Sequence, residues 1–334
     1  MTPPTPVTRP TGWRERIWPG WMSRDISLVL FARLAMSAFR ALAGIITPIY
    51  LVRIGFSAAE LGLLFVAVAI TSALLSATVG LLADRIGRKP FLIALPLLAG
   101  LAAMVFATTR SNIPLLFIFA GLGSFGRGAG AGGGMIGPYQ PAEQALLADS
   151  TPVRARNDVF GRVGFFSSLG ALIGGPLAAL PDALPDALPH MPVGVTEMTG
   201  YRIAFLVMAG LAVVAALLVI PIAETRHANQ PHPSATASAT RGRWNPLRTV
   251  SPAAWPVLLR LWATNSVNGL AVGFFGPFIT YWFYVRYGAG PGTIGVIYTL
   301  INIAALASNL YAPRLAARLG LVRAIFVGRI LQSI

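Results

Sequence analysis

The sequence contains no cysteine, so it can form no disulfide, carry no thiol nucleophile and offer no thiolate ligand to a metal. Charged residues are also scarce, at 11% of the 334 residues, whereas soluble proteins carry roughly 25%. Acids number 11 against 26 basic residues, and Lys89 is the single lysine. With 55% hydrophobic residues and a mean hydropathy of +0.68, this composition indicates a membrane protein with several spans.

The net charge of +15 does not indicate a nucleic-acid partner, because the basic residues lie in short loops and form no basic domain. The glycines of Gly121-x-Gly123-x-x-Gly126 follow no strand and lie in an apolar run, so they do not predict dinucleotide binding. The three histidines lie in loops without metal-ligand spacing. We therefore expect no enzyme activity, no metal, no cofactor and no nucleic acid.

Long apolar runs predict an all-α, polytopic helical bundle, because a helix needs roughly 20 apolar residues to cross the hydrocarbon core. Residues 1–25 are polar and precede the first run, which predicts a disordered cytoplasmic tail and an uncleaved first span. We expect eight complete spans and the start of a ninth, at residues 26–52, 59–83, 90–109, 113–137, 159–181, 200–223, 254–284, 292–313 and 322 onward.

The basic residues of the loops predict the orientation, because cytoplasmic loops carry an excess of arginine and lysine. One set of loops holds only Arg53, Arg110, Arg202 and Arg286. The opposite set of loops holds many more basic residues, which predicts that the N-terminus lies in the cytoplasm. We expect the membrane to be a bacterial inner (plasma) membrane. The basic residues of this richer set are Arg9, Arg14, Arg16, Arg24, Arg85, Arg88, Lys89, Arg154, Arg156, Arg162, Arg226, Arg241, Arg243, Arg248, Arg314, Arg318 and Arg323.

The turn between the second and third predicted spans reads GLLADRIGRKP over residues 80–90. Its pattern resembles the loop between segments 2 and 3 of the major facilitator superfamily, although a hairpin turn with ordinary cytoplasmic charges is the alternative. The resemblance implies two pseudo-symmetric six-helix halves whose cytoplasmic faces are held together by this loop and released during transport. A conformational-gating role would then fall on Gly80, Asp84, Arg85, Gly87, Arg88 and Lys89.

An internal repeat supports the same organisation. Gly55, Gly62 and Gly87 recur as Gly288, Gly295 and Gly320, each 233 residues later. A polar linker over 225–252 separates a six-helix half at 26–224 from a partial second half at 253–334, which holds spans 7, 8 and the start of 9. A complete second half would extend about a hundred residues beyond the last residue, so we expect a chain truncated in its ninth span.

Two further stretches resemble efflux members of the family. Residues 139–149, followed by Pro152 and Arg156, resemble the connection between segments 4 and 5 of bacterial efflux proteins, and Arg127 resembles an arginine of the segment 4 motif. Gly175 and Pro176 partly match a glycine-rich antiporter motif and predict a helix bend. These matches imply export of drug-like molecules coupled to protons.

Arg33, Arg40 and Arg127 lie within predicted spans, where a buried charge normally faces a cavity or a partner. All acids fall in loops or at span ends, so the sequence predicts no mid-span acid for these arginines. Three interpretations remain: a cavity that binds an organic anion, satisfaction by helix-end carbonyls and water, or pairing with a loop acid such as Glu143. A coupling proton would then use Asp84, a loop acid or a residue beyond the chain.

Amides in the seventh and eighth spans, Asn265, Asn268, Asn302 and Asn309, are expected either to line a cavity or to bond neighbouring helices. The hypothesis is therefore secondary active transport of a small solute by alternating access, performed by a monomer in the lipid bilayer. Drug-like efflux and organic-anion transport are the two substrate hypotheses. A truncated membrane protein that transports nothing is the alternative of another class.

Overall fold

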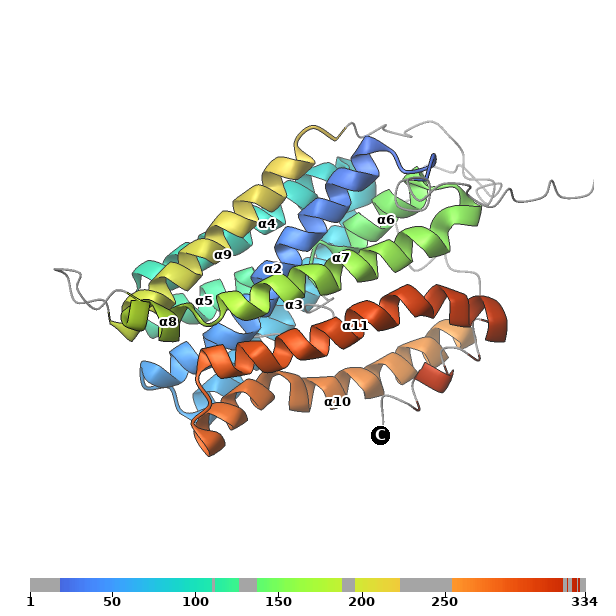
Figure 1. Ribbon diagram of the computed structural model, residues 1–334. Coiled ribbons are helices and arrows are strands. Elements are labelled where there is room, and N and C mark those ends of the chain that lie inside the picture. Colours follow the sequence, from blue (N-terminus) through green and yellow to red (C-terminus); the bar gives the residue numbers. More distant parts are fainter. Residues whose placement is uncertain are drawn as a thin grey trace, which may run out of the picture.

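The computed structural model describes residues 19–109, 112–125, 137–187, 196–222 and 254–320, with residues 323, 326–328 and 330. Over these residues the chain forms a bundle of long helices without strands (Figure 1). The helices are α2 (Arg24–Arg53), α3 (Ala58–Ile86), α4 (Lys89–Thr108), α5 (Ile113–Gly123), α6 (Gln140–Ser150), the 3-10 helix η1 (Val153–Ala155), α7 (Arg156–Leu177), α8 (Leu180–Ala187), α9 (Glu197–Val219), α10 (Trp255–Tyr287) and α11 (Pro291–Leu319).

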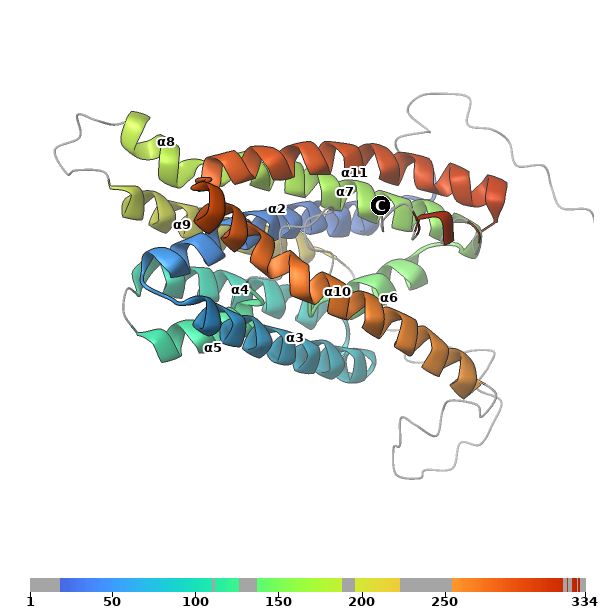
Figure 2. The ribbon, with the colours of Figure 1, turned by 90° about the horizontal axis from the view of Figure 1, so that it is seen from below.

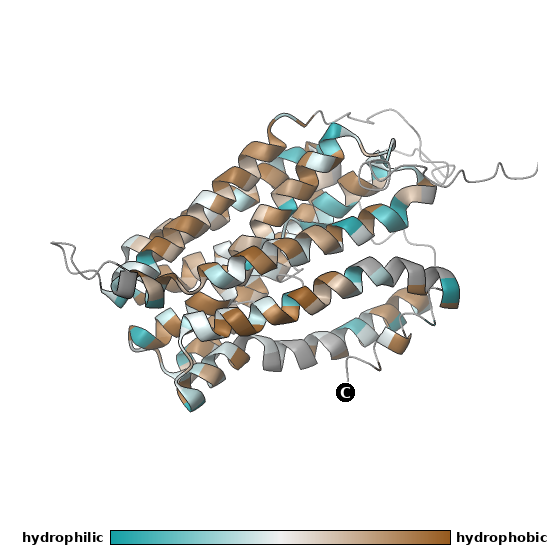
Figure 3. Ribbon diagram, viewed as in Figure 1, coloured by the Kyte–Doolittle hydropathy of each residue, from teal (hydrophilic) through white to brown (hydrophobic). Residues whose placement is uncertain are grey.

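Within the described residues, six helical stretches are long and apolar enough to cross a membrane. They lie at 24–53, 58–83, 89–108, 156–185, 197–219 and 291–309. Figure 3 shows apolar residues along most of α4 and α9, with hydrophilic residues more frequent toward the ends of the bundle. The all-helical, polytopic fold predicted from the sequence is therefore confirmed.

The region of the predicted fourth span, 113–137, differs from the prediction. Its helix α5 ends at Gly123, where Ser124 takes a left-handed conformation with φ of 55°, and residues 126–136 lie outside the described part. The following connection forms an additional helix, α6. Three of its apolar residues, Ala142, Leu146 and Leu147, are buried on one side, and this amphipathic stripe accounts for the helix.

Helix α2 is the centre of the bundle and is buried along most of its length. Ser23 caps its start by accepting a hydrogen bond from the backbone N–H of Ile26 at 3.2 Å. On α7, a Cβ atom at Gly170 would clash with the carbonyl oxygen of Leu34, and one at Gly174 would clash with that of Ala38. The glycines thus permit the close approach that joins α2 and α7.

The helical hairpins α2–α3 and α10–α11 have glycines with positive φ at corresponding turns. Gly55 and Gly288 have φ of 101° and 63°, while Gly87 and Gly320 have φ of 107° and 79°. Only glycine adopts such values without strain. The intervening helices α3 and α11 each contain 29 residues, which confirms the internal repeat in the backbone itself.

The turns define two ends of the bundle, here called the Gly55 end and the Gly87 end. Helices α10 and α11, the C-terminal pair, pack against the N-terminal group formed by α2–α9. Figure 2 shows α11 running alongside α7, and α10 crossing the bundle near α2. The contact between the two groups therefore runs mainly along α7 and α11.

Candidate functional site

Two arginines of the central helix form the core of a buried polar cluster. Arg33 and Arg40 are seven residues apart on α2 and therefore share one face. Arg33 is 3% exposed and Arg40 is 7% exposed. Buried charges require partners. These partners are Tyr139 directly before α6, Glu143 on α6 and Ser167 on α7.

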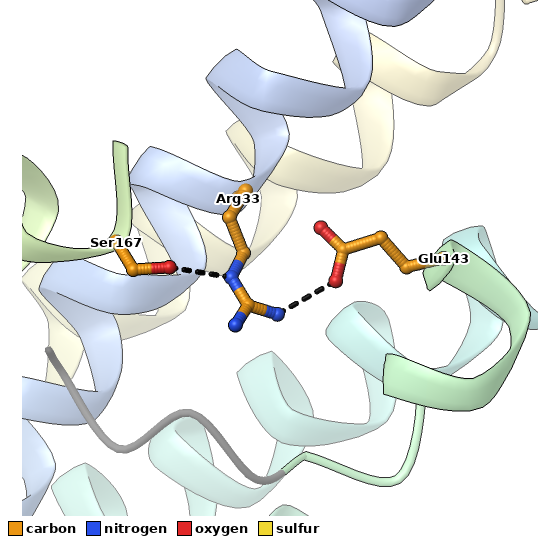
Figure 4. A network of polar contacts seen from close by, with 3 residues as sticks. All are labelled: Arg33, Glu143 and Ser167. Atoms are coloured by element: carbon orange, nitrogen blue, oxygen red, sulfur yellow. Dashed lines mark hydrogen bonds and ion pairs between the residues drawn. The ribbon is translucent and has the colours of Figure 1, made fainter. Parts of the chain in front are cut away.

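Arg33 lies between two helices that are distant in sequence (Figure 4). Its Nη1 donates to Oε2 of Glu143 on α6 at 2.6 Å, and its Nε donates to Oγ of Ser167 on α7 at 2.8 Å. The ion pair is fully enclosed, because both side chains are 3% exposed. Such charge-assisted bonds are roughly twice as strong as neutral ones, so Arg33 joins α2, α6 and α7.

The position of Glu143 decides between the three interpretations for Arg33. Sequence reasoning placed Glu143 in a loop, whereas the amphipathic helix α6 turns it into the bundle, where it is 2% exposed. Of the three interpretations, pairing with a loop acid is the one observed for Arg33. Glu143 lies outside the six candidate spans, and burial raises the pKa of its carboxyl while Arg33 and Arg40 oppose that rise.

Arg40 lies against the residues that precede α6. Its guanidinium lies over the ring of Tyr139, 5.6 Å from the ring centroid, a cation–π distance. It also lies so close to Gly137 that a Cβ there would come within 2.6 Å of Nη2. With Glu143 ionised, the two arginines leave this cluster with a formal charge of +1.

A small cavity of about 20 Å³ adjoins the ion pair. It is lined by Arg33, Tyr139 and Glu143 together with apolar residues of α4 and α9, among them Leu92 and Ala215. One water molecule needs a cavity of roughly 10–15 Å³ or more. This cavity thus has room for a water molecule and is far too small for a drug-sized solute.

The predicted gating turn lies at the Gly87 end. Gly80 and Arg85 lie on α3, Gly87 ends that helix in the left-handed region, and Lys89 begins α4. Nη1 of Arg88 lies 2.6 Å from Oδ2 of Asp149 on α6, in a solvent-exposed ion pair. The turn is therefore fastened to the same helix that carries Glu143. The side chain of Asp84 lies outside the described part of the structure.

The other predicted site residues are dispersed. Asn302 on α11 is buried and donates to the carbonyl oxygen of Tyr298, and Asn265 is exposed on α10 and donates to that of Leu261, both at 2.8 Å. Asn309, by contrast, donates to Ser168 on α7 at 2.9 Å and so bonds a neighbouring helix. Arg127 and the side chain of Asn268 lie outside the described residues.

Gly175 lies in the last turn of α7 beside Pro176, where the sequence predicts a bend. A Cβ atom at Gly175 would clash with Oγ1 of Thr299 and come within 2.9 Å of the carbonyl oxygen of Gly295. Gly175 thus permits close contact between α7 and α11. Whether Gly175 and Pro176 also bend α7 during a transport cycle stays a prediction.

Sequence reasoning missed the contacts that join the two helix groups at the Gly55 end. Asp182 of α8 accepts a 2.8 Å hydrogen bond from the backbone N–H of Gly292 at the start of α11. Arg53 pairs with Glu197 at 2.8 Å and lies over the ring of Tyr284 on α10, 5.5 Å from its centroid. Local sequence gave no signal for these contacts, because each one joins distant segments.

Comparison with known proteins relates this arrangement to membrane transporters. The sequence model described as Major Facilitator Superfamily matches residues 29–334. No curated protein sequence matches the chain. Among solved structures, the fold is similar to a bacterial homolog of the human lysosomal transporter Spinster in its inward-facing and unoccupied conformation, with a TM-score of 0.54 and 14% identity over 90% of this chain.

The chain spans 61% of the length of that relative. The similarity in fold agrees with the helix order and apolar composition described above, and this family consists of multi-pass membrane transporters rather than enzymes. Because the family model covers nearly all of the sequence, the chain belongs to the Major Facilitator Superfamily.

Proposed function

We propose that this chain is a secondary active transporter that moves a small solute by alternating access, through rocking of residues 26–224 against residues 253–334, with residues 225–252 as the linker between them. The observation that carries the proposal is the contact between the two groups. It runs along α7 and α11, and it is reinforced at the Gly55 end by Asp182 with Gly292 and Arg53 with Tyr284. Rocking about such a line opens one end as the other closes.

The gating role of Gly80, Asp84, Arg85, Gly87, Arg88 and Lys89 is part of this proposal. It is supported by the ion pair between Arg88 and Asp149, which fastens the turn to α6. In the proposed orientation the Gly87 end and the N-terminus face the cytoplasm of a bacterial cell, and the protein works as a monomer.

Proton-coupled efflux of drug-like molecules is the favoured form of transport. A carboxylate enclosed in a bundle is the chemical group that such coupling requires, and Glu143 supplies one. Its pairing with Arg33 also leaves only one net positive charge in the cluster, which reduces the attraction of the site for anions.

Organic-anion transport is the second candidate, because one specific observation favours it. Arg33 and Arg40 bring two guanidinium groups to a single buried acid. An anion that reached this cluster would meet two guanidinium groups and one carboxylate. In this form of transport Asn302 and Asn265 would line the solute path, together with Asn268 and Arg127.

The test is transport by the purified chain in liposomes with an imposed pH gradient. A cationic fluorescent dye and a fluorescent organic anion are offered in parallel, and an R88D variant is the matched control for gating. Proton-driven movement of the dye supports drug efflux, and movement of the anion supports the second candidate. If neither probe moves faster than in liposomes without protein, the proposed function is wrong.

A further inference from the structure

We infer that Glu143 is the group that takes up and releases the coupling proton, and that α6 transmits its protonation to the turn at Gly87. The inference rests on the proposed function and names the proton site that this function requires. The geometry of the three helices α2, α6 and α7 carries it.

Arg33 and Ser167 belong to one rigid body. The glycine contacts of Gly170 with Leu34 and of Gly174 with Ala38 bring α2 and α7 into backbone contact, so the donor and its hydroxyl partner move together. Glu143 comes from α6, a separate and short helix (Figure 4). Breaking the contact between Glu143 and Arg33 therefore removes the ion pair between α6 and α2 and leaves the packing of α2 on α7 intact.

Protonation of Glu143 changes the charge balance of the cluster. A proton from the aqueous phase forms an O–H bond on the carboxylate, the ion pair with Arg33 is lost, and the formal charge rises from +1 to +2. Among the described residues, the other ionisable groups facing this carboxyl are Arg40 of α2 and Tyr139, which immediately precedes α6. Ser167 of α7 is polar but does not titrate in this range.

No acid from α4 or α9 is available at this position to replace the carboxylate. Those helices line the adjoining cavity with apolar residues, which are Leu92, Pro96, Ala215 and Val219. Arg33 then keeps its hydrogen bond to Ser167 but has lost the negative charge of Glu143, and a buried charge without its counter-charge is unfavourable. Protonation therefore favours separation of α6 from α2. The cavity of about 20 Å³ has room for one water molecule, which would then carry the proton to the carboxylate.

The far end of α6 lies at the predicted gate. Asp149 follows Glu143 by six residues, about 9 Å along a helix axis, and pairs with Arg88 of the turn at 2.6 Å. In the described part of the chain, α6 makes two ion pairs, one enclosed and one at the surface. When the enclosed pair is lost, the surface pair with Arg88 still links α6 to the turn, so a displacement of α6 reaches the turn through it.

The test measures the position of α6 by electron-spin resonance, which requires no substrate. The chain has no cysteine, so cysteines introduced at the exposed residues Gln144 of α6 and Leu217 of α9 carry the only spin labels. The distance distribution is recorded for the full chain in lipid nanodiscs from about pH 5 to pH 9, which brackets the titration of a buried carboxyl.

In the labelled parent protein we expect the distances to shift with pH. E143Q should show the acid-form distances at every pH, while E60Q should shift as the parent does, because Glu60 is an exposed acid at the start of α3. The double variant R33Q/E143Q removes both charges and leaves no arginine without its carboxylate, so it is the variant to measure if E143Q does not fold. It should also show no shift with pH.

A parent protein whose distances do not depend on pH, or a variant without Glu143 that keeps the parental shift, overturns the inference. Failure of the proposed function has a different signature. In that case liposomes carry neither probe although the spin-label distances still respond to protonation of Glu143.

Discussion

Asp182 and Gly292 are 110 residues apart in sequence, yet the carboxylate of Asp182 caps the first turn of α11 through a 2.8 Å bond from the Gly292 N–H. Helix N-termini carry unpaired N–H groups and a partial positive charge, which a carboxylate satisfies. The cap joins α8 of the N-terminal group to the C-terminal pair. It is therefore a contact that any separation of the two groups at the Gly55 end must break.

Replacement of Asp182 tests the strength of this cap. D182A should destabilise the chain by about 0.5–2 kcal/mol, the usual loss when a capping side chain is removed. D182N should lose less, because its amide oxygen still accepts the Gly292 N–H. Thermal unfolding of both variants in detergent checks the order, and an unfolding temperature for D182A equal to that of the parent would contradict it.

Gly175 tests the close packing of α7 on α11. G175A should be destabilising by about 1–3 kcal/mol, because the added methyl group overlaps Thr299 and Gly295. Gly210 on α9 is the control, since a Cβ there meets nothing within 4 Å. G210A should be neutral or slightly stabilising, because alanine favours a helix. Equal thermal stability of the two variants would refute a packing role for Gly175.

The ion pair of Arg88 with Asp149 is exposed, so its direct effect on stability should be small. A double-mutant cycle with R88A and D149A should give a coupling free energy of about 1 kcal/mol or less. Its effect on transport should be larger: R88D or D149R alone lowers the transport rate, and the swapped pair R88D/D149R recovers part of it. Absence of any recovery in the swapped pair would show that the pair itself is not required.

Cysteine labelling tests the orientation, and the cysteine-free background makes every introduced thiol unique. In intact cells, a membrane-impermeant reagent should label a cysteine at exposed Ala58, near the Gly55 end. It should reach one at exposed Ile86, near the Gly87 end, only after permeabilisation. The opposite pattern would contradict the proposed orientation.

The long helices could be predicted from sequence because apolar runs of sufficient length form helices in a membrane whatever their partners. The repeat was also visible, since Gly55, Gly87 and their counterparts occupy turns that require a left-handed conformation. The turn at Gly87, for which a gating role is proposed, could be located because its charged residues stand alone between apolar runs. All of these features depend on short stretches of chain.

The buried ion pair could not be predicted in the same way. Glu143 lies in a polar stretch of α6, and its burial follows from the packing of Ala142, Leu146 and Leu147 against the bundle rather than from the polarity of the stretch. The sequence left three kinds of surroundings open for Arg33, whereas the inward face of α2 directs its side chain to α6 and α7. Tertiary packing decided both outcomes.

The equal lengths of α3 and α11 restrict how this protein can change. Each helix sets a fixed spacing of 29 residues between two glycine turns. Inserting one residue into either helix would rotate everything beyond it by about 100° and advance it by about 1.5 Å. Substitutions on these helices are therefore tolerable where insertions and deletions are not, and length, more than composition, is the property that the two copies hold in common.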